Sequence, residues 1–156
     1  MNKLTDEVLK ERYNKLYKKF VKGDFTEVIK GCNKILLKRK HQNFFNLLCV
    51  TYQKTGEIDK SIKVMNEALA LNPNHPNFLN NLGTCFYMLH KFSKAEKYFK
   101  KGLEIDNKHL HTLNNLGNLK RETFKIEQSI NFYKKVLDIQ KDAVPTLFDL
   151  VGIYRI

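Results

Sequence analysis

Apolar residues recur along most of this chain at intervals of three and four positions, which is the spacing of one face of an α-helix. One apolar stripe runs through residues 45–52 and a second through residues 58–69. Between them, Thr55-Gly56-Glu57 interrupts the pattern, and glycine readily takes the left-handed conformation that ends a helix. No segment shows the strict alternation typical of a strand. The pattern predicts an all-α fold.

The helical pattern also repeats along the sequence. The segment Leu79–Gly83 reads Leu-Asn-Asn-Leu-Gly and recurs at Leu113–Gly117. This offset, about 34 residues, is typical of stacked helix–turn–helix units that bury their apolar faces against one another. The sequence therefore predicts a single array. Its expected repeats are residues 8–40, 42–75, 76–109 and 110–143, followed by a partial fifth unit at 144–156.

Composition and charge narrow the class of protein. The 156 residues are 42% hydrophobic and 28% charged, and the net charge is +12. A basic excess can indicate nucleic-acid binding, but many of these lysines fall between the core positions of the second helices, where a solvated face is expected. Nucleic-acid binding is kept as the lower alternative. No apolar run is long enough to span a membrane, and the N-terminus lacks the apolar region of a secretory signal.

Three cysteines indicate the redox environment. Cys32, Cys49 and Cys85 are odd in number and widely spaced, so neither a disulfide framework nor a zinc site is expected. Their register places them at small core positions, where free cysteines are common. A reducing, cytoplasmic location follows as an expectation.

The spacing of aromatic, leucine and glycine positions within each repeated unit resembles the tetratricopeptide repeat. The resemblance implies a right-handed α-solenoid of tandem units with a binding face on the first helices. The usual tryptophan position holds another residue in each repeat, and the turn glycine is replaced by His90 and Phe124. Those two turns are expected to be locally strained or rearranged, because positive φ is unfavourable for side chains with a Cβ.

Within that family, residues 113–122 are most similar to the repeats of O-linked N-acetylglucosamine transferase and its bacterial relatives. The resemblance implies that Asn81 and Asn115 belong to a ladder of asparagines that grips the backbone of an extended peptide. An amide side chain suits this role because it both donates and accepts hydrogen bonds. Helical geometry extends the candidate peptide-binding set to Asn77, Asn80, Asn81, Thr84, His111, Asn114, Asn115 and Asn118. The alternative is that these residues hold helix ends or contacts between repeats.

Catalytic and metal sites are not indicated by the sequence. His109 and His111 form the only close histidine pair, and on a helix their rings would point to different faces. No phosphate-binding loop or nucleophile motif is present. We therefore expect no enzyme activity, no metal and no cofactor. The lysines of the carboxylate clamp known in some members of the family are mostly missing, so binding of a terminal carboxylate is not expected either.

The final helix is expected to provide an interface. Its apolar residues lie on more than one side, and uncovered apolar patches commonly mark contact surfaces. We expect docking against a second copy, which would give a homodimer, or against further residues of a longer protein. The residues assigned to this interface are Leu147, Leu150, Val151 and Tyr154.

Two classes of function follow. The first is a non-catalytic scaffold that binds a protein or an extended peptide. The second is a substrate-targeting segment of a larger transferase.

Overall fold

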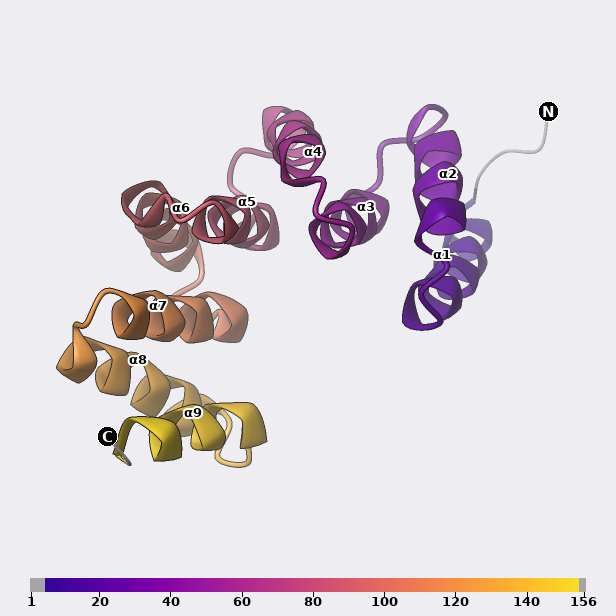
Figure 1. Ribbon diagram of the computed structural model, residues 1–156. Coiled ribbons are helices and arrows are strands. Elements are labelled where there is room, and N and C mark those ends of the chain that lie inside the picture. The colour runs from indigo at the N-terminus through magenta and orange to yellow at the C-terminus, as the bar shows by residue number, and fades with distance from the viewer. Residues whose placement is uncertain (1–4, 155–156) are drawn as a thin grey trace. The chain divides into compact units, whose positions relative to one another are not determined.

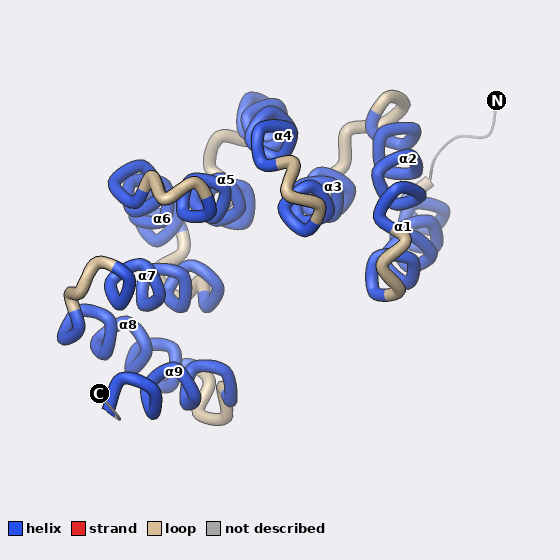
Figure 2. Tube along the Cα trace, in the orientation of Figure 1, coloured by secondary structure: helices blue, strands red, loops and turns tan. Residues whose placement is uncertain are grey.

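The computed structural model describes residues 5–154, with the side chain of residue 154 outside the description. Within this range every regular element is an α-helix, as the sequence predicted, and the connections are short turns (Figures 1 and 2). The helices are α1 (Asp6–Val21), α2 (Phe25–Leu36), α3 (Gln42–Lys54), α4 (Ile58–Leu71), α5 (Pro76–Met88), α6 (Phe92–Ile105), α7 (Leu110–Glu122), α8 (Ile126–Ile139) and α9 (Val144–Tyr154). None of these described helices is long and apolar enough to cross a membrane.

The helices belong to two compact units. Unit 1 is Met1–Pro73 and contains α1 to α4, whereas unit 2 is Asn74–Ile156 and contains α5 to α9. Within each unit, consecutive helices pack as antiparallel pairs. The division falls at the linker that the sequence predicts between the second and third repeats.

The two helices of a pair approach closely at one small residue. A Cβ atom at Gly83 of α5 would lie 2.6 Å from the ring of Phe99, and one at Gly117 of α7 would lie 2.4 Å from the ring of Tyr133. In α3 the same register holds Cys49, which is buried. These contacts explain why the repeated segment needs glycine at its fifth position: no side chain fits there beside a buried aromatic ring.

The helix ends follow the sequence prediction. Pro76 occupies the first turn of α5, where its missing N–H costs no hydrogen bond. The turn residues Gly23 and Gly56 have positive φ angles of 85° and 76°. His90 and Phe124 adopt the same conformation, with φ of 55° and 56°, although both carry a Cβ. Both turns therefore keep the positive φ of the repeat without a glycine.

The cysteines also lie where the sequence placed them. Cys32, Cys49 and Cys85 are all buried free thiols. Burial raises the pKa of the Cys32 thiol to about 12, so this group is a neutral part of the core at physiological pH. Its role is packing rather than chemistry.

Lys120 is a departure from the repeat that the sequence pattern alone does not explain. It occupies the register of Tyr52 and Phe86, yet it is only 4% exposed. Its ammonium lies 2.9 Å from a carboxylate oxygen of Glu96 on α6. Burial opposes ionisation of Glu96, but hydrogen bonds from Lys100 and Lys120 hold the pKa of its carboxyl below the usual value. An ion pair between α6 and α7 thus accommodates a lysine at a register that holds an aromatic residue in α3 and α5.

Candidate functional site

The polar face of unit 2 is built on α5 and α7, the first helices of two successive pairs. At its centre Asn80 is only 7% exposed. Its side-chain oxygen accepts hydrogen bonds from the Thr112 hydroxyl at 3.2 Å and from the Asn115 amide at 2.9 Å. The same Asn115 amide also donates to the Thr84 hydroxyl at 3.2 Å. Asn80, Thr84 and Asn115, all predicted to contact a ligand, therefore contact one another across the joint between α5 and α7.

His109 extends this network at the start of α7. It is the N-cap residue of the helix, so the helical argument that separated its ring from His111 does not apply, and the ring centroids lie 5.9 Å apart. Its Nε2 lies 2.6 Å from the Asn77 side-chain oxygen, and its Nδ1 lies 2.6 Å from the Thr112 hydroxyl, whose single proton can go either to this nitrogen or to the Asn80 oxygen. Burial and the neighbouring His111 lower the pKa of His109, against the opposing charge of Asp106.

Two further asparagines of α7 are tied to the helices that follow. The Thr146 hydroxyl of α9 donates to the Asn114 side-chain oxygen at 2.8 Å. The Tyr133 hydroxyl of α8 donates to the Asn118 side-chain oxygen at 2.7 Å. Burial raises the pKa of Tyr133 to about 12, so its hydroxyl keeps its proton for this bond.

These contacts fix which way each amide points. Asn77, Asn114 and Asn118 each use the side-chain oxygen within the protein, and these bonds do not engage their amino groups, which are hydrogen-bond donors. Asn115 shows the opposite arrangement, because its amino group makes both bonds and its oxygen takes part in neither. We call Asn77, Asn114, Asn115 and Asn118 the amide row. Asn77 is exposed and the other three are half-buried.

Two predicted residues of this face, His111 and Asn81, remain to be located. His111 is exposed, and Asn81 is half-buried on α5 beside the network. The sequence analysis missed Thr112 and Thr146, which are fully buried partners of the asparagines. A signal for them was present: Asn80 and Thr112 are 32 residues apart, as are Asn114 and Thr146, and the second pair lies one repeat period after the first.

The helix α9 carries the predicted interface. Leu147 and Val151 are 42% and 48% exposed, and Leu150 is half-buried. The side chain of Tyr154 lies outside the described residues. Ile153, on the same helix, is buried. Phe148, which the sequence analysis did not single out, is 73% exposed.

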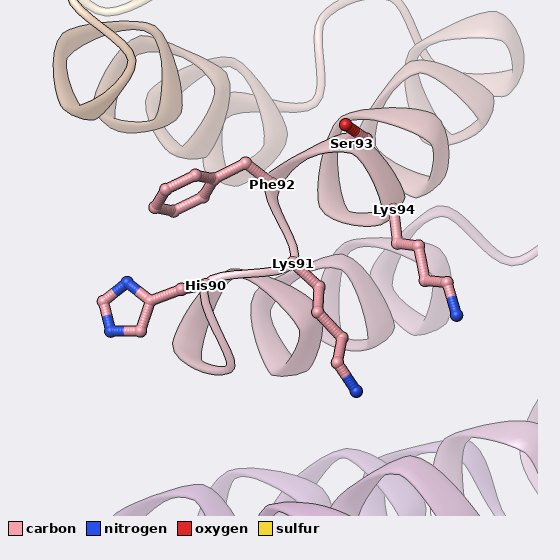
Figure 3. A pocket seen from close by; sticks show the side chains of 5 residues that line it. All are labelled: His90, Lys91, Phe92, Ser93 and Lys94. Carbon is pink, nitrogen blue, oxygen red and sulfur yellow. The ribbon is translucent and has the colours of Figure 1, made fainter.

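A shallow pocket of about 440 Å³ surrounds the strained turn between α5 and α6 (Figure 3). It is lined by His90, Lys91, Phe92, Ser93 and Lys94. Figure 3 shows the Lys91 and Lys94 side chains pointing in the same direction, away from Ser93. The described residues contain no group of three or more side chains able to hold a metal ion.

Comparisons with known proteins agree with this architecture. Residues 42–108 and 109–145 match family models described as tetratricopeptide repeat. A thermophilic TPR protein of Thermus thermophilus superimposes with a TM-score of 0.85 at 13% identity, over 93% of this chain and 80% of that one.

Two of the similar structures are described as binding peptides. YrrB, described as a TPR protein with an unusual peptide-binding site, gives a TM-score of 0.69 at 21% identity, over 88% of this chain and 71% of that one. The first TPR of Spaghetti (RPAP3), solved with an HSP90 peptide, gives 0.66 at 19% identity, over 71% and 88%. At these identities the likeness concerns the fold alone, and no curated protein sequence matches the chain. With both family matches and nine described helices packed in sequential pairs, the chain belongs to the tetratricopeptide repeat family.

Proposed function

We propose that this protein is a non-catalytic binding module that holds an extended peptide segment against the amide row of unit 2. The observation that carries the proposal is the orientation of the amides. The internal bonds engage the oxygens of Asn77, Asn114 and Asn118 and the amino group of Asn115, so they do not use three amino groups and one oxygen on two adjacent helices. A peptide backbone offers both partners at regular spacing, since each residue has one C=O and one N–H.

The chemistry of the row favours a peptide over a nucleic acid. Its side chains are neutral amides, whereas phosphate recognition depends on lysine and arginine and weakens steeply with salt. The lysines of the second helices, such as Lys97 on α6 and Lys134 on α8, are exposed instead. Binding to the row should therefore change little between low and moderate salt. A collapse of affinity with salt would favour phosphate contacts by the lysines.

The resemblance to the repeats of the O-linked N-acetylglucosamine transferase supports the same assignment, because their asparagines are expected to grip a peptide backbone. It also supports the alternative that this chain serves as the targeting segment of a larger transferase. A cytoplasmic location remains an expectation from the free cysteines.

The test of this proposal uses the hydrogen bonds that the asparagine side chains make within the protein. Asn114→Asp and Asn118→Asp keep a side-chain oxygen for Thr146 and Tyr133 but replace the amino groups with carboxylate oxygens. A peptide is first selected from a random peptide display library on the full chain, and its dissociation constant is measured by fluorescence anisotropy. We expect the double variant to bind it at least tenfold more weakly, which is about 1.4 kcal/mol.

The matched control is Asn131→Asp, an exposed position on α8 that adds one negative charge away from the row. Its affinity should equal that of the wild type at moderate salt. If no peptide is selected, or if the double variant binds as well as Asn131→Asp does, the amide row is not the binding site. Unchanged circular dichroism of all variants confirms that the comparison concerns binding.

A homodimer through α9 stays a separate prediction. Leu147 and Val151 are exposed on this helix, and a twofold arrangement of two such helices would cover both copies equally. Sedimentation of the chain over a range of concentrations tests it, and a strictly monomeric protein with an ordered α9 would refute it.

A further inference from the structure

A cavity of about 390 Å³ lies in unit 1, where the first half of α1 meets the start of α3. Its volume is within the range of sites that hold small ligands. None of its residues belongs to the amide row, which lies in unit 2. We call this cavity the α1–α3 pocket, and it is lined by Asp6, Leu9, Lys10, Tyr13, Asn14, His41 and Asn43.

The apolar part of the α1–α3 pocket is held in place by packing. Leu9 is buried, and the half-buried ring of Tyr13 meets the ring of Phe44 edge-on, with the centroids 5.9 Å apart. Phe44 is itself fully buried. Burial also raises the pKa of Tyr13, so its hydroxyl keeps its proton and can donate a hydrogen bond. Carbon atoms of a ligand can therefore pack against Leu9 and Tyr13.

His41 contributes a hydrogen-bond donor to the pocket. As the N-cap residue of α3, it accepts a hydrogen bond at Nδ1 from the backbone N–H of Asn43 at 3.3 Å. This bond requires a lone pair on Nδ1, so the ring carries its proton on Nε2. The imidazole also lies edge-on to Phe44, with the ring centroids 5.7 Å apart. The Nε2–H group is therefore a donor that the capping bond does not use.

The charges around the pocket leave one cation without a partner. Among the described residues of the lining, Asp6 is the only carboxylate, and its oxygen lies 2.8 Å from the Arg39 guanidinium. Within residues 5–154, the side chains of Lys10, Asn14 and Asn43 make no hydrogen bond or ion pair. The lining thus offers one ammonium and two side-chain amides to a ligand.

This combination of groups suits a carboxylate. A carboxylate accepts several hydrogen bonds and carries a single negative charge, which matches the one unpaired ammonium. A phosphate group carries up to two negative charges and is commonly held by arginine, and no arginine is among the described residues that line the pocket. The apolar surface of Leu9 and Tyr13 further favours an organic acid over an inorganic anion.

We propose that the α1–α3 pocket binds a carboxylate group, carried either by a small organic acid or by an acidic side chain of a partner protein. The Lys10 ammonium supplies the opposite charge, and the His41 Nε2–H group and the Asn43 amide supply directional donors. Leu9 and Tyr13 pack against the carbon atoms next to the carboxylate. The site lies in a different unit from the amide row, so it does not rest on the proposed function.

The test uses the full chain, labelled with nitrogen-15, and two capped amino acids as probes. N-acetylglutamate N′-methylamide carries the carboxylate, whereas N-acetylglutamine N′-methylamide has the same shape without the charge. In NMR titrations at moderate salt, the glutamate probe should shift the amide signals of residues 6–14 and 41–43 until they saturate. We expect the glutamine probe to bind about tenfold more weakly, because it cannot pair with the lysine.

Three variants locate the site. Lys10→Gln should weaken binding of the glutamate probe about tenfold, because the carboxylate loses its charged partner. Lys34→Gln is the matched control, since it removes the same charge from an exposed position of α2 outside the pocket, and its affinity should equal that of the wild type. Asn43→Asp adds a carboxylate to the pocket and should abolish the saturable shifts. An acidic residue in the first turn of a helix is favourable, so this variant should remain folded.

Acetate as a third probe distinguishes the two sources of the carboxylate. If acetate binds at least as tightly as the glutamate probe, the pocket takes a small organic acid; if the glutamate probe binds more tightly, the pocket takes an acidic side chain of a protein. Equal binding of the two capped probes, equal affinity of Lys10→Gln and Lys34→Gln, or tighter binding of inorganic phosphate would overturn the proposal. None of these results bears on peptide selection by the amide row, so the two proposals fail separately.

Discussion

Asn80 offers the most direct measure of what the joint between α5 and α7 contributes to stability. Its side-chain oxygen is buried and accepts two hydrogen bonds from α7. Asn80→Ala removes this acceptor and leaves Thr112 and Asn115 each with one other partner, His109 at 2.6 Å and Thr84 at 3.2 Å. The variant thus removes two bonds without leaving either donor wholly unsatisfied.

The expected magnitude follows from these contacts. A typical intramolecular hydrogen bond contributes about 0.5 to 1.5 kcal/mol net, and a buried group left poorly satisfied costs about 1 to 3 kcal/mol. Because both donors keep a second partner, we expect a loss of about 1.5 to 3 kcal/mol. Alanine is a better helix former than asparagine by about 0.5 kcal/mol, which offsets part of it. The free energy of unfolding should therefore fall by about 1 to 2.5 kcal/mol.

The control is Asn131→Ala, which makes the same chemical change at an exposed position of α8. It should be neutral or stabilising by up to about 0.5 kcal/mol, since only helix propensity changes. Urea unfolding followed by circular dichroism compares the two variants. Hydrogen exchange read by mass spectrometry should show faster exchange in α5 and α7 of Asn80→Ala and no change in α1 to α4. Equal unfolding free energies for the two variants, with unchanged exchange, would refute the view that this network holds the joint.

Two further predictions concern packing and pH. Gly117→Ala should destabilise the protein by about 1 to 3 kcal/mol, because its Cβ would lie 2.4 Å from the ring of Tyr133. Gly152→Ala should instead stabilise it by up to about 1 kcal/mol, because a Cβ there meets nothing within 4 Å and alanine is the better helix former. Thermal unfolding of both variants checks this. The pKa of His109 is lowered in the folded protein, so folding disfavours protonation of its ring. Neutral His109 therefore contributes to the free energy of unfolding above about pH 6.5, the ordinary pKa of histidine, and this contribution is lost as the pH falls through the folded pKa. Urea midpoints measured between about pH 7.5 and pH 5 should fall less in His109→Gln than in the wild type; the remaining fall is attributed to His75, whose pKa burial also lowers.

The fold was predictable because its determinants are local and periodic. The spacing of apolar residues sets the face that each helix buries, and the repeat period sets which helices pair. The backbone conformation at single turn positions could also be predicted from the sequence. Gly56 and the non-glycine residues His90 and Phe124 take the positive φ that the repeated turn demands. Each of these expectations depends on residues within one repeat, so a single sequence contains the information.

The roles of the polar residues were harder to predict because they depend on contacts between repeats. Sequence register placed Asn80 and Asn115 together on one face, but their bonds depend on the rotation of α5 against α7 and on a threonine 32 residues away. The same reason applies to Lys120. Its register predicts an aromatic core contact, and only the presence of Glu96 on the preceding helix shows how a charge is accommodated there. The apolar pattern within one repeat predicts which residues are buried. The polar partner of a buried residue can be identified only from the three-dimensional structure.

The internal bonds of the amide row bear on recognition as well as on stability. A free asparagine side chain loses rotational freedom when it binds a ligand, and ordering a flexible side chain at an interface costs about 0.5 to 1.5 kcal/mol. Asn114 and Asn118 are already held through their oxygens by Thr146 and Tyr133. A ligand that bonds to their amino groups therefore avoids most of this cost. The two readings of the asparagines, as ligand contacts and as links between helices, are thus compatible: the bonds that join the helices orient the opposite side of each amide for binding.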